Sequence, residues 1–512
     1  MPRNILRHWT ERLKIENLVN TIQTAYLQSS KEVTPPLNKP KIPQEIRNII
    51  KEARRLRKSI RKRRARCMPI EPRVRTRLNY QKAKIKRGVK AARQQQWITT
   101  VSSLHPRQGS KFWSTLRALS GQTSPTHPLR VNNIVLTSPA DKAAAFANTL
   151  TQVFVPNVSP HFDQHRHYVR AEATVQKLLR TPRAEILPND PILGAISMEE
   201  VISSVAKKKT KSAPGRDQVS WKVLETLPPN ILSTIAIILT CILRLQHWPT
   251  ALKDGVFVMI PKPGKDTQDP KNWRPICLLP TISEILESIL TMRITTMIEQ
   301  SNCLPKSQHG FRHNRGTGTA LLRLIVTIVN AFHQKKVASA LFLDINRAFD
   351  TIPHNLLLFK LHSTHNLSIP TIKLFHSFLN NRQCTVRVGA THSPVFVPQA
   401  GVPQGCPLSP LLYNLYCADL PVSQAPFKQE YAEDTMYLTI SNNTISNCSK
   451  FNNIVLPALT AWMKNWRIAP NPDKTVLVHF IAANQGLSQD DKARGVQFWG
   501  QHILYHRSQP NT

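Results

Sequence analysis

Paired cysteines are missing from this sequence. Its 512 residues include eight cysteines, and no two of them form a Cys-x-x-Cys pair. The eight are Cys67, Cys241, Cys277, Cys303, Cys384, Cys406, Cys417 and Cys448. This scattered spacing excludes a zinc knuckle and gives no sign of a disulfide framework, so we expect reduced thiols.

Long apolar segments are missing as well. The longest apolar run extends from Ile231 to Leu243 and contains a serine and two threonines, whereas a helix that spans a bilayer needs about 20 apolar residues. The N-terminus lacks the apolar core of a secretory signal. We therefore expect an intracellular protein, in the nucleus and/or the cytoplasm, that is neither secreted nor inserted in a membrane.

Acidic residues are scarce. The chain has 30 Asp plus Glu against 69 Lys plus Arg, which gives a formal net charge of +39 and an isoelectric point near 10.4. A solvated basic surface explains an excess of a few charges but not one of this size. The imbalance therefore indicates a polyanionic partner, above all nucleic acid.

The basic residues are concentrated between positions 41 and 100, where there are 21 Lys plus Arg and three Glu. Apolar residues from Ile46 to Ile60 recur at helical spacing beneath a basic run from Arg54 to Arg66. Each cation that neutralises a phosphate releases a counterion, so such a helix should bind RNA or DNA without sequence preference. A nuclear-localisation signal in Arg61–Arg66 and a merely solvated helix remain alternatives.

Two segments place carboxylates where strands end. An apolar strand pattern from Leu341 leads into Asp344, and Tyr431-Ala-Glu-Asp434 is centred where a hairpin would turn. Between them, residues 401–410 are rich in turn formers and open a helix. Each feature alone is no more than a strand ending at a turn. Together they suit divalent metal ions held against a phosphate.

A basic loop lies upstream, between two short strand patterns at 256–260 and 272–280. It would bring Lys262, Lys265 and Arg274 together as a clamp for a triphosphate, although such loops are also common on ordinary surfaces. Helices are expected over about 354–361, 371–379 and 445–466, and strands over 384–388 and 476–480. Residues 101–190 are expected to be helical and to supply core packing, not chemistry. The order predicts an α+β fold with an antiparallel sheet backed by helices.

Seven segments of the chain follow one another in the order of a known family. They are Ile260-Pro-Lys-Pro-Gly-Lys265, Trp273-Arg-Pro-Ile-Cys-Leu-Leu-Pro280, Gln308-His-Gly-Phe-Arg312, Phe342-Leu-Asp-Ile-Asn-Arg-Ala-Phe-Asp350, Gly401-Val-Pro-Gln-Gly-Cys-Pro-Leu-Ser-Pro410, Tyr431-Ala-Glu-Asp-Thr435 and Asn471-Pro-Asp-Lys-Thr475. In these segments the chain resembles the reverse transcriptase of a non-long-terminal-repeat (LINE) retrotransposon of the jockey-like kind. The basic helices before residue 190 resemble, in character only, the segment that joins an endonuclease to the polymerase in such elements.

The resemblance implies the fingers and palm of a right-hand polymerase, preceded by basic helices. The thumb is expected to be absent, because the motifs run out at Phe498-Trp-Gly500, a variant of the family's primer grip. The expected divisions are a tail at 1–40, a basic nucleic-acid-binding segment at 41–110, a helical connector at 111–190, fingers at 191–335, a palm at 336–482 and a truncated end at 483–512. An RNA template, a DNA primer and deoxynucleoside triphosphates are the implied partners. The oligomeric state stays open.

A metal site is also implied by the resemblance. Asp344, Glu433 and Asp434, with the backbone carbonyl of Ile345, match the ligands of two Mg²⁺ ions, which Mn²⁺ can replace. Lys474 matches a proton donor to the leaving pyrophosphate.

The same resemblance implies four contacts to the incoming nucleotide. Lys262 and Arg274 match triphosphate contacts, Phe349 matches the aromatic residue that excludes a ribose 2′-hydroxyl, and Gln404 matches a contact to the sugar and base.

Glu433 departs from the family, which has aspartate there. Mg²⁺ requires nearly ideal octahedral geometry at about 2.0–2.1 Å, and preorganised sites tolerate displacements of about 0.5 Å, less than an added methylene produces. The polar stretch Lys428-Gln-Glu430 adds a charge nearby, and Glu284 replaces a usual lysine. We therefore expect an RNA-directed DNA polymerase whose activity is weak or absent in this copy.

Two alternatives come from other classes. One is a non-catalytic nucleic-acid-binding protein derived from a reverse transcriptase, which would bind RNA but extend no primer. The other is a group II intron-type maturase, which shares the glycine loop but should not carry the Leu278–Glu287 segment.

Overall fold

The structure, a computed structural model, describes residues 17, 19–22, 24–25, 43–65, 68–69, 71–102, 128–157, 165–208, 212–301, 303–421, 427–482 and 495–504. The chain divides into two units, one of residues 28–126 and one of residues 1–27 with 127–512. Among the described residues, no helix is both long and apolar enough to cross a membrane.

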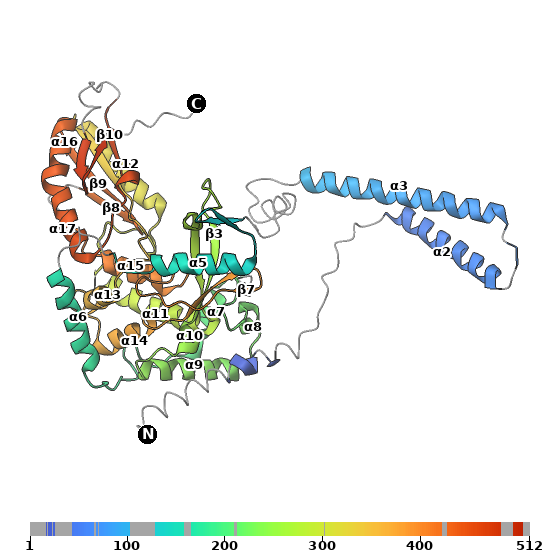
Figure 1. The fold of residues 1–512 in the computed structure, drawn as a ribbon, viewed down its shortest axis with the longest axis horizontal. Helices are drawn as coiled ribbons and strands as arrows, with labels where there is room; N and C mark the ends of the chain where they lie inside the picture. Colours follow the sequence, from blue (N-terminus) through green and yellow to red (C-terminus); the bar gives the residue numbers. More distant parts are fainter. Residues whose placement is uncertain are drawn as a thin grey trace. The chain divides into compact units, whose positions relative to one another are not determined.

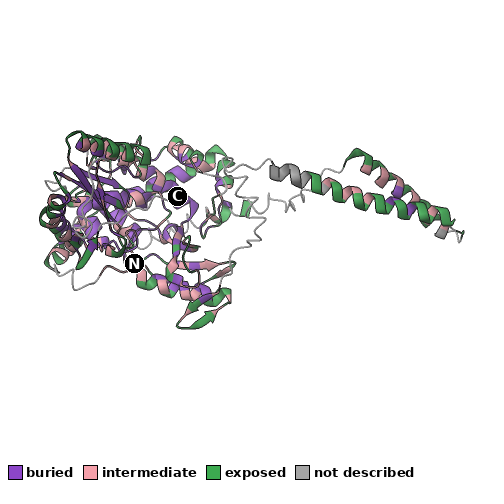
Figure 2. Ribbon diagram, turned by 90° about the horizontal axis from the view of Figure 1, so that it is seen from above, coloured by how far each residue is buried: buried purple, intermediate pink, exposed green. Residues whose placement is uncertain are grey.

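The smaller unit contains two helices, α2 (Gln44–Ala65) and α3 (Pro72–Ser102), which pack against each other (Figure 1). Leu78 is buried in their apolar seam. A Cβ on Gly88 would lie only 1.9 Å from Ile46 Cδ1, so glycine is what permits this close approach. Most other described positions on both helices, including most of the cationic ones, are exposed (Figure 2). The basic region predicted from the sequence is therefore helical, with its charge directed to solvent.

A four-stranded antiparallel sheet, with strand order β10-β5-β9-β8, forms one half of the larger unit. Its strands are β5 (Val337–Leu343), β8 (Phe427–Tyr431), β9 (Asp434–Ser441) and β10 (Val476–Phe480). Helix α12 (Thr317–His333) covers one face and α16 (Thr444–Lys450) packs on the other (Figure 1). The strand over 476–480 was predicted with these bounds.

Strand β5 is buried on both faces of this sheet. Ala338 and Ala340 belong to the apolar cluster beneath α12, whereas Leu341 and Leu343 belong to the main core of the unit. A central strand that is covered on both faces consists of a nearly continuous run of apolar residues. This burial explains the sequence of β5, and it holds the residue that follows the strand in a fixed place.

A second four-stranded sheet, with strand order β4-β3-β6-β7, forms the other half. Its strands are β3 (Gly255–Pro261), β4 (Trp273–Leu278), β6 (Cys384–Val388) and β7 (Thr391–His392). Strands β3 and β6 pair in parallel, whereas the other two pairs are antiparallel. The sequence predicted an antiparallel-centred sheet and did not predict this parallel pair. The mixed pairing arises because a long segment with several helices returns the chain to β3 in the same direction.

Helices surround both sheets, in keeping with an α+β fold. They are α5 (Pro139–Val153), α6 (His165–Arg180), α7 (Met198–Ala206), α8 (Trp221–Glu225), α9 (Pro229–Arg244), α10 (Thr250–Lys253), α11 (Thr281–Gln300), α13 (His354–Ser363), α14 (Ile369–Leu379), α15 (Leu408–Cys417) and α17 (Leu456–Trp466), with short helical turns at Pro270–Asn272 and Pro472–Lys474. Two small hairpins complete the unit, β1 (Leu129–Val131) with β2 (Ile134–Leu136), and β11 (Gly495–Phe498) with β12 (Gln501–Leu504).

Two expectations about this unit need correction. The helix expected over 445–466 is divided by a π-helical segment at Phe451–Val455. Pro457 follows that segment and has no N–H to donate to Asn453, so the regular hydrogen-bond ladder cannot continue there. The region expected to be helical at 101–190 also contains the β1–β2 hairpin, at whose turn Asn132 and Asn133 both have positive φ. Asparagine tolerates that conformation, and helical spacing carries no signal for such a turn.

Lys360 of α13 is a buried cation whose removal should destabilise the larger unit. Its Nζ lies 2.5 Å from both the Tyr416 carbonyl oxygen and Asp419 Oδ1, and 3.7 Å from the centre of a Trp466 ring. Breaking a buried ion pair costs about 3–5 kcal/mol, and a third of the Asp419 side chain is exposed. We expect Lys360→Met to lower the free energy of unfolding by about 2–4 kcal/mol in chemical denaturation. The exposed Lys222→Met should change it by less than about 0.5 kcal/mol. Equal effects of the two changes would contradict this account.

Candidate active site

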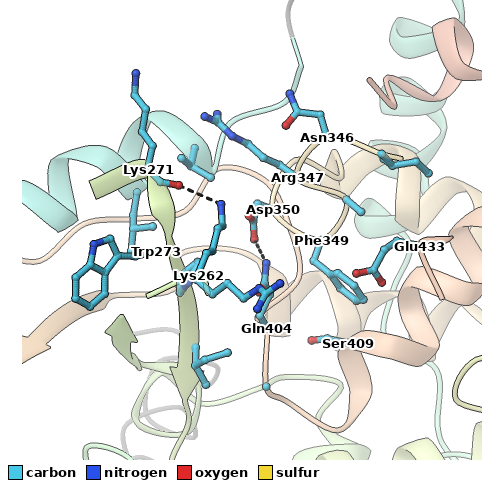
Figure 3. A pocket seen from close by; sticks show the side chains of 18 of the residues that line it. Lys262, Lys271, Trp273, Asn346, Arg347, Phe349, Asp350, Gln404, Ser409 and Glu433 are labelled. Atoms are coloured by element: carbon cyan, nitrogen blue, oxygen red, sulfur yellow. Dashed lines mark hydrogen bonds between the residues drawn. The ribbon is translucent and has the colours of Figure 1, made fainter. Parts of the chain in front are cut away.

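A cavity of about 910 Å³ lies between the two sheets. Its walls come from the ends of β5 and α5, the β3–β4 connection, the 401–410 loop, the β8–β9 turn and the 471–474 turn. All the site residues predicted from the sequence line it, namely Lys262, Arg274, Asp344, Ile345, Phe349, Gln404, Glu433, Asp434 and Lys474 (Figure 3 shows several of them). Lys265, the third cation of the predicted clamp, does not line it.

Asp344 is placed by the end of β5 and fixed by the 471–474 turn. Asn471 Nδ2 donates to Asp344 Oδ2 at 2.9 Å, and the backbone N–H of Asn471 donates to the Asp344 carbonyl at 2.8 Å. Lys474 Nζ lies 3.3 Å from the same Oδ2. The backbone hydrogen bonds on either side of Ile345 are made by the Asp344 carbonyl and the Asn346 N–H, and neither of them involves the Ile345 carbonyl. The turn therefore orients the carboxylate and brings a cation beside it.

The β8–β9 hairpin delivers the other two carboxylates, Glu433 in the turn and Asp434 at the first position of β9. Strand register pairs Leu343 with Thr435, so the next residue of each strand, Asp344 and Asp434, lies at the same edge of the sheet. Burial raises the pKa of Glu433, the negative charges of Asp434 and Asp344 raise it further, and Arg274 opposes the shift. Burial and Asp344 likewise raise the pKa of Asp434. The three carboxylates are therefore electrostatically coupled.

The Gln308–Gly310 segment fixes the turn of this hairpin through hydrogen bonds to its backbone. Gln308 Oε1 accepts from the backbone N–H of Ala432 at 3.0 Å, and its Nε2 donates to the Ala432 carbonyl at 3.4 Å. A Cβ on Gly310 would lie 2.3 Å from the Ala432 nitrogen. The motif noticed in the sequence thus has a structural role, because only glycine lets the loop approach the turn that carries Glu433.

Two charged departures from the family's pattern, the Lys428–Glu430 stretch and Glu284, are neutralised by ion pairs. Lys428 and Glu430 are each 2% exposed and pair with each other at 3.2 Å, and Ser307 donates to Glu430 at 2.6 Å. Glu284 pairs with Lys208 at 2.9 Å. The charge expected beside the carboxylates is therefore neutralised by a neighbour.

The opposite side of the cavity is cationic. Lys262 Nζ donates to the Lys271 carbonyl at 3.1 Å, and Arg274 and Arg347 are exposed at the rim. Burial lowers the pKa of Lys262, and the nearby charges of Lys474 and Arg274 lower it further. Grouped cations of this kind attract a multiply charged anion such as a triphosphate.

Phe349 and Gln404 lie between the carboxylates and the cations (Figure 3). The Phe349 ring stacks on Tyr413, with centroids 4.7 Å apart and planes 29° apart. Gln404 Nε2 donates to Asp350 Oδ1 at 2.7 Å. Both side chains are therefore held in place at the centre of the cavity.

The carboxylates suit a divalent cation by their chemistry, because hard oxygen donors are what Mg²⁺ prefers. Among the described residues, no three His, Cys, Asp or Glu side chains form a cluster that could hold a metal ion. Mg²⁺ is commonly bound in proteins by one or two carboxylates together with substrate phosphates.

One wall of the cavity was missed from the sequence. Thr149, Leu150 and Val153 of α5 line it, although residues 101–190 were expected to contribute packing alone. The carbonyl of Phe154, just after α5, accepts from the N–H groups of Gln399 and Ala400 at 3.0 and 3.1 Å. Nothing in the apolar pattern of α5 distinguishes a residue that faces a cavity from one that faces a core.

A sheet that presents carboxylates from a strand end and an adjoining hairpin, opposite a cationic wall, defines the class of the nucleotide-polymerising enzymes. Residues 260–503 match the family model described as "Reverse transcriptase (RNA-dependent DNA polymerase)". The chain therefore carries a reverse transcriptase domain and is related to the non-long-terminal-repeat retrotransposon polymerases, as the motifs predicted.

Three relatives illustrate that relationship. The chain is 31% identical over 379 residues to the "Probable RNA-directed DNA polymerase from transposon BS" of Drosophila melanogaster, covering 72% of this chain and 40% of that protein. It is 32% identical over 378 residues to the "RNA-directed DNA polymerase from mobile element jockey" of the same species, covering 72% and 39%. With the "Probable RNA-directed DNA polymerase from transposon X-element" it shares 29% identity over 481 residues, covering 91% and 50%. The chain thus spans about 40–50% of the length of these relatives.

Proposed function

We propose that this chain copies RNA into DNA, adding deoxynucleotides to the 3′-hydroxyl of a DNA primer on an RNA template. The observation that carries the proposal is the single cavity in which Asp344 and the acidic β8–β9 hairpin face a cationic wall. In this proposal the β5 sheet belongs to the palm (336–482), and β3, β4 and α11 belong to the fingers (191–335).

Asp344, Glu433, Asp434 and the Ile345 carbonyl would hold two Mg²⁺ ions, or Mn²⁺ in their place. When bound, two such ions stabilise the attacking and leaving oxygens of a phosphoryl transfer. Lys474, 3.3 Å from Asp344, would donate a proton to the departing pyrophosphate.

The remaining site residues would position the nucleotide. Lys262 and Arg274 lie where they can contact the triphosphate, and holding it in place converts the transfer into an intramolecular step. The stacked Phe349 ring is rigid enough to exclude a ribose 2′-hydroxyl, and Gln404 contacts the sugar and base. We further propose that activity is weak in this copy, because Glu433 is one methylene longer than the family's aspartate.

Primer extension tests the proposal against the alternative of a non-catalytic binding protein. The full chain is incubated with an RNA template, a labelled DNA primer, deoxynucleotides and Mg²⁺, and with a DNA template as a comparison. Extension on the RNA template supports the polymerase. Tight binding of the primer–template without any product, in Mg²⁺ and in Mn²⁺, would favour the binding protein.

We also propose that the protein is located inside the cell, in the nucleus and/or the cytoplasm.

The α2–α3 helices are proposed to supply much of the affinity for nucleic acid. We expect that replacing Lys82, Lys86 and Lys90 of α3 by glutamine will flatten the slope of log affinity against log salt by about 2–3, since each phosphate neutralised contributes about 0.7–0.9. These lysines are exposed, so the helix should keep its fold, which circular dichroism can verify. The charge-neutral change Asn79→Gln on the same helix is the control. An unaltered slope in the triple variant would mean that α3 does not contact phosphates.

A further inference from the structure

Three thiols lie together in the core, where β3 and β4 meet the 401–410 loop. Cys277 of β4, Cys384 of β6 and Cys406 of the loop are all free and buried. A Cβ on Gly255 of β3 would lie 2.8 Å from Cys277 Sγ and 3.3 Å from Cys384 Sγ. The thiol of Cys406 donates a hydrogen bond to the Cys277 sulfur. The polymerase chemistry proposed above uses none of these groups.

Arg382 is a buried cation beside these thiols. It is 4% exposed, and among the described residues its guanidinium forms no ion pair with a carboxylate. Its Nη2 donates to Cys277 Sγ at 3.6 Å. Burial raises the pKa of Glu287 to about 8, so this carboxyl, whose charge would also act on Arg382, is protonated at neutral pH. An unpaired charge in the interior is costly, and a thiolate at Cys277 supplies the missing negative charge.

Cys277 and Cys406 therefore differ in protonation. The hydrogen bond from Cys406 lowers the pKa of Cys277 and the charge of Arg382 lowers it further, although burial opposes both. Burial raises the pKa of Cys406, and the hydrogen bond to Cys277 raises it further. One sulfur is thus a thiolate, the nucleophilic form, and a thiol lies next to it. A reactive cysteine beside a second cysteine is the arrangement of redox-sensing sites.

Cys384 lies beside the same glycine but is too far from Cys277 for a disulfide. Strand β3 separates β4 from β6. Neighbouring strands lie about 4.8 Å apart, so the two Cα atoms are roughly 9–10 Å apart, beyond the about 7 Å that a disulfide can span. The 401–410 loop, by contrast, runs directly against β4. The Cys277 N–H donates to the Gln404 carbonyl at 2.8 Å, and a Cβ on Gly405 would lie 3.2 Å from the Cys277 carbonyl oxygen.

We propose that Cys277 and Cys406 form a reversible disulfide when the protein meets a hydroperoxide, and that this bond inactivates the neighbouring cavity. Cys406 lines the cavity, so a small oxidant that enters it reaches the pair. The Cys277 thiolate attacks one peroxide oxygen, the O–O bond breaks, and the departing hydroxide takes up a proton to form water. Cys406 then attacks the sulfenic sulfur. The S–S bond forms, the S–O bond breaks, and the hydroxide leaves as water with the Cys406 proton. The two sulfurs lose two electrons, which the peroxide gains.

The new bond would act on the loop that carries cavity residues. A covalent bond draws the two sulfurs closer together than a hydrogen bond does, and Gly405 already lies against β4, so the loop must shift. Gln404 and Ser409 of this loop line the cavity (Figure 3). Because preorganised sites tolerate displacements of only about 0.5 Å, we expect oxidation to lower primer extension about tenfold or more. This consequence rests on the proposed function, whereas the disulfide itself does not.

Non-reducing peptide mass spectrometry tests the disulfide without any need for activity. The reduced full chain is treated with excess hydrogen peroxide, its remaining thiols are blocked, and it is digested. We expect the peptides that contain Cys277 and Cys406 to be joined, and dithiothreitol to release them. Cys384→Ser, which removes an equally buried thiol beside the same glycine, is the matched control and should leave the link unchanged. In Cys406→Ser the link should be absent, and dimedone should trap Cys277 as its sulfenic acid.

Changes at Arg382 test the origin of the reactivity. Arg382→Met removes the cation and should slow formation of the link about tenfold, because the rate follows the fraction of thiolate. Arg382→Lys keeps the charge and should remain closer to the rate of the unaltered chain. Circular dichroism verifies that both variants fold, and the Cys406→Ser result gives a reading even if they do not.

Contrary results are equally specific. Absence of the Cys277–Cys406 link in excess peroxide, a link from Cys277 to Cys384, or an unchanged rate in folded Arg382→Met would overturn the proposed pair. Peroxide should no longer lower primer extension in Cys277→Ser, and an equal loss there would overturn the inactivation. A link in a chain that extends no primer even when fully reduced would refute the proposed function and leave the disulfide standing.

Discussion

Asp344→Asn is expected to reduce primer extension at least a thousandfold, which corresponds to about 4 kcal/mol of activation free energy. Asparagine keeps the shape of the side chain but removes the charge that a divalent cation needs. Because the other two carboxylates lie on the separate β8–β9 hairpin, neither can take its place. The loss should be in turnover, with affinity for the primer–template unchanged, since the interaction is made fully only in the transition state.

The fold should tolerate this change. The ion pair that Asp344 makes with Lys474 is partly exposed, with 33% and 65% of the two side chains accessible, and such pairs contribute at most about 1 kcal/mol. Thermal unfolding should therefore be nearly unaltered. Glu225→Gln is a matched control, because it removes one carboxylate charge at an exposed position outside the cavity. Extension by Asp344→Asn within tenfold of the unaltered chain would show that the cavity is not the active site.

Glu433→Asp is expected to increase turnover about tenfold or more, and to do so more than any other single change. The turn that carries Glu433 is fixed by Gln308 and Gly310, so the backbone cannot retreat to accommodate the longer side chain. The extra methylene therefore displaces the carboxylate by more than the ~0.5 Å that a preorganised site tolerates. This displacement should reduce the stabilisation of the transition state and leave template binding intact.

Asp434→Glu makes the opposite change on the next residue and should lower turnover. The pair of variants therefore distinguishes a ligand of the wrong length from a general sensitivity of the hairpin. Both are best measured in this chain and in a version extended at its C-terminus with the corresponding segment of a longer relative. If the extended chain is fully active with Glu433 in place, glutamate serves as well as aspartate, and the proposal of a weakened site is wrong.

The sequence predicted those features that local chemistry determines. The burial of β5 leaves an apolar run that ends at Asp344, and the acidic turn at Glu433 and Asp434 shows its own hairpin signal. The strand over 384–388 and most helix positions also follow from local spacing. Residues whose roles came only from resemblance also lie around one cavity.

What the sequence could not predict depends on contacts between distant segments. The parallel pairing of β3 with β6 is one example, since neither strand contains a signal for its partner. The wall contributed by Thr149 and Val153 is another, because an apolar helix face looks the same whether it meets a core or a cavity. The hydrogen bond from Gln404 to Asp350 joins residues 54 positions apart, and its polarity becomes visible only once both side chains are placed.

The strand pairings described above also bear on how the chain reaches its native state during synthesis. Gly255 of β3 pairs with Cys384 of β6, and Phe342 of β5 pairs with Val476 of β10, so each partner emerges from the ribosome more than 120 residues later. At about 5–20 residues per second, that interval is on the order of ten seconds. For most of the interval between β5 and β10, β5, one of the most apolar strands, lacks both of its neighbours, because β9 also emerges late in that interval. Such non-local topology folds slowly and leaves an aggregation-prone edge exposed, so the yield of native protein should depend on chaperones that shield nascent strands.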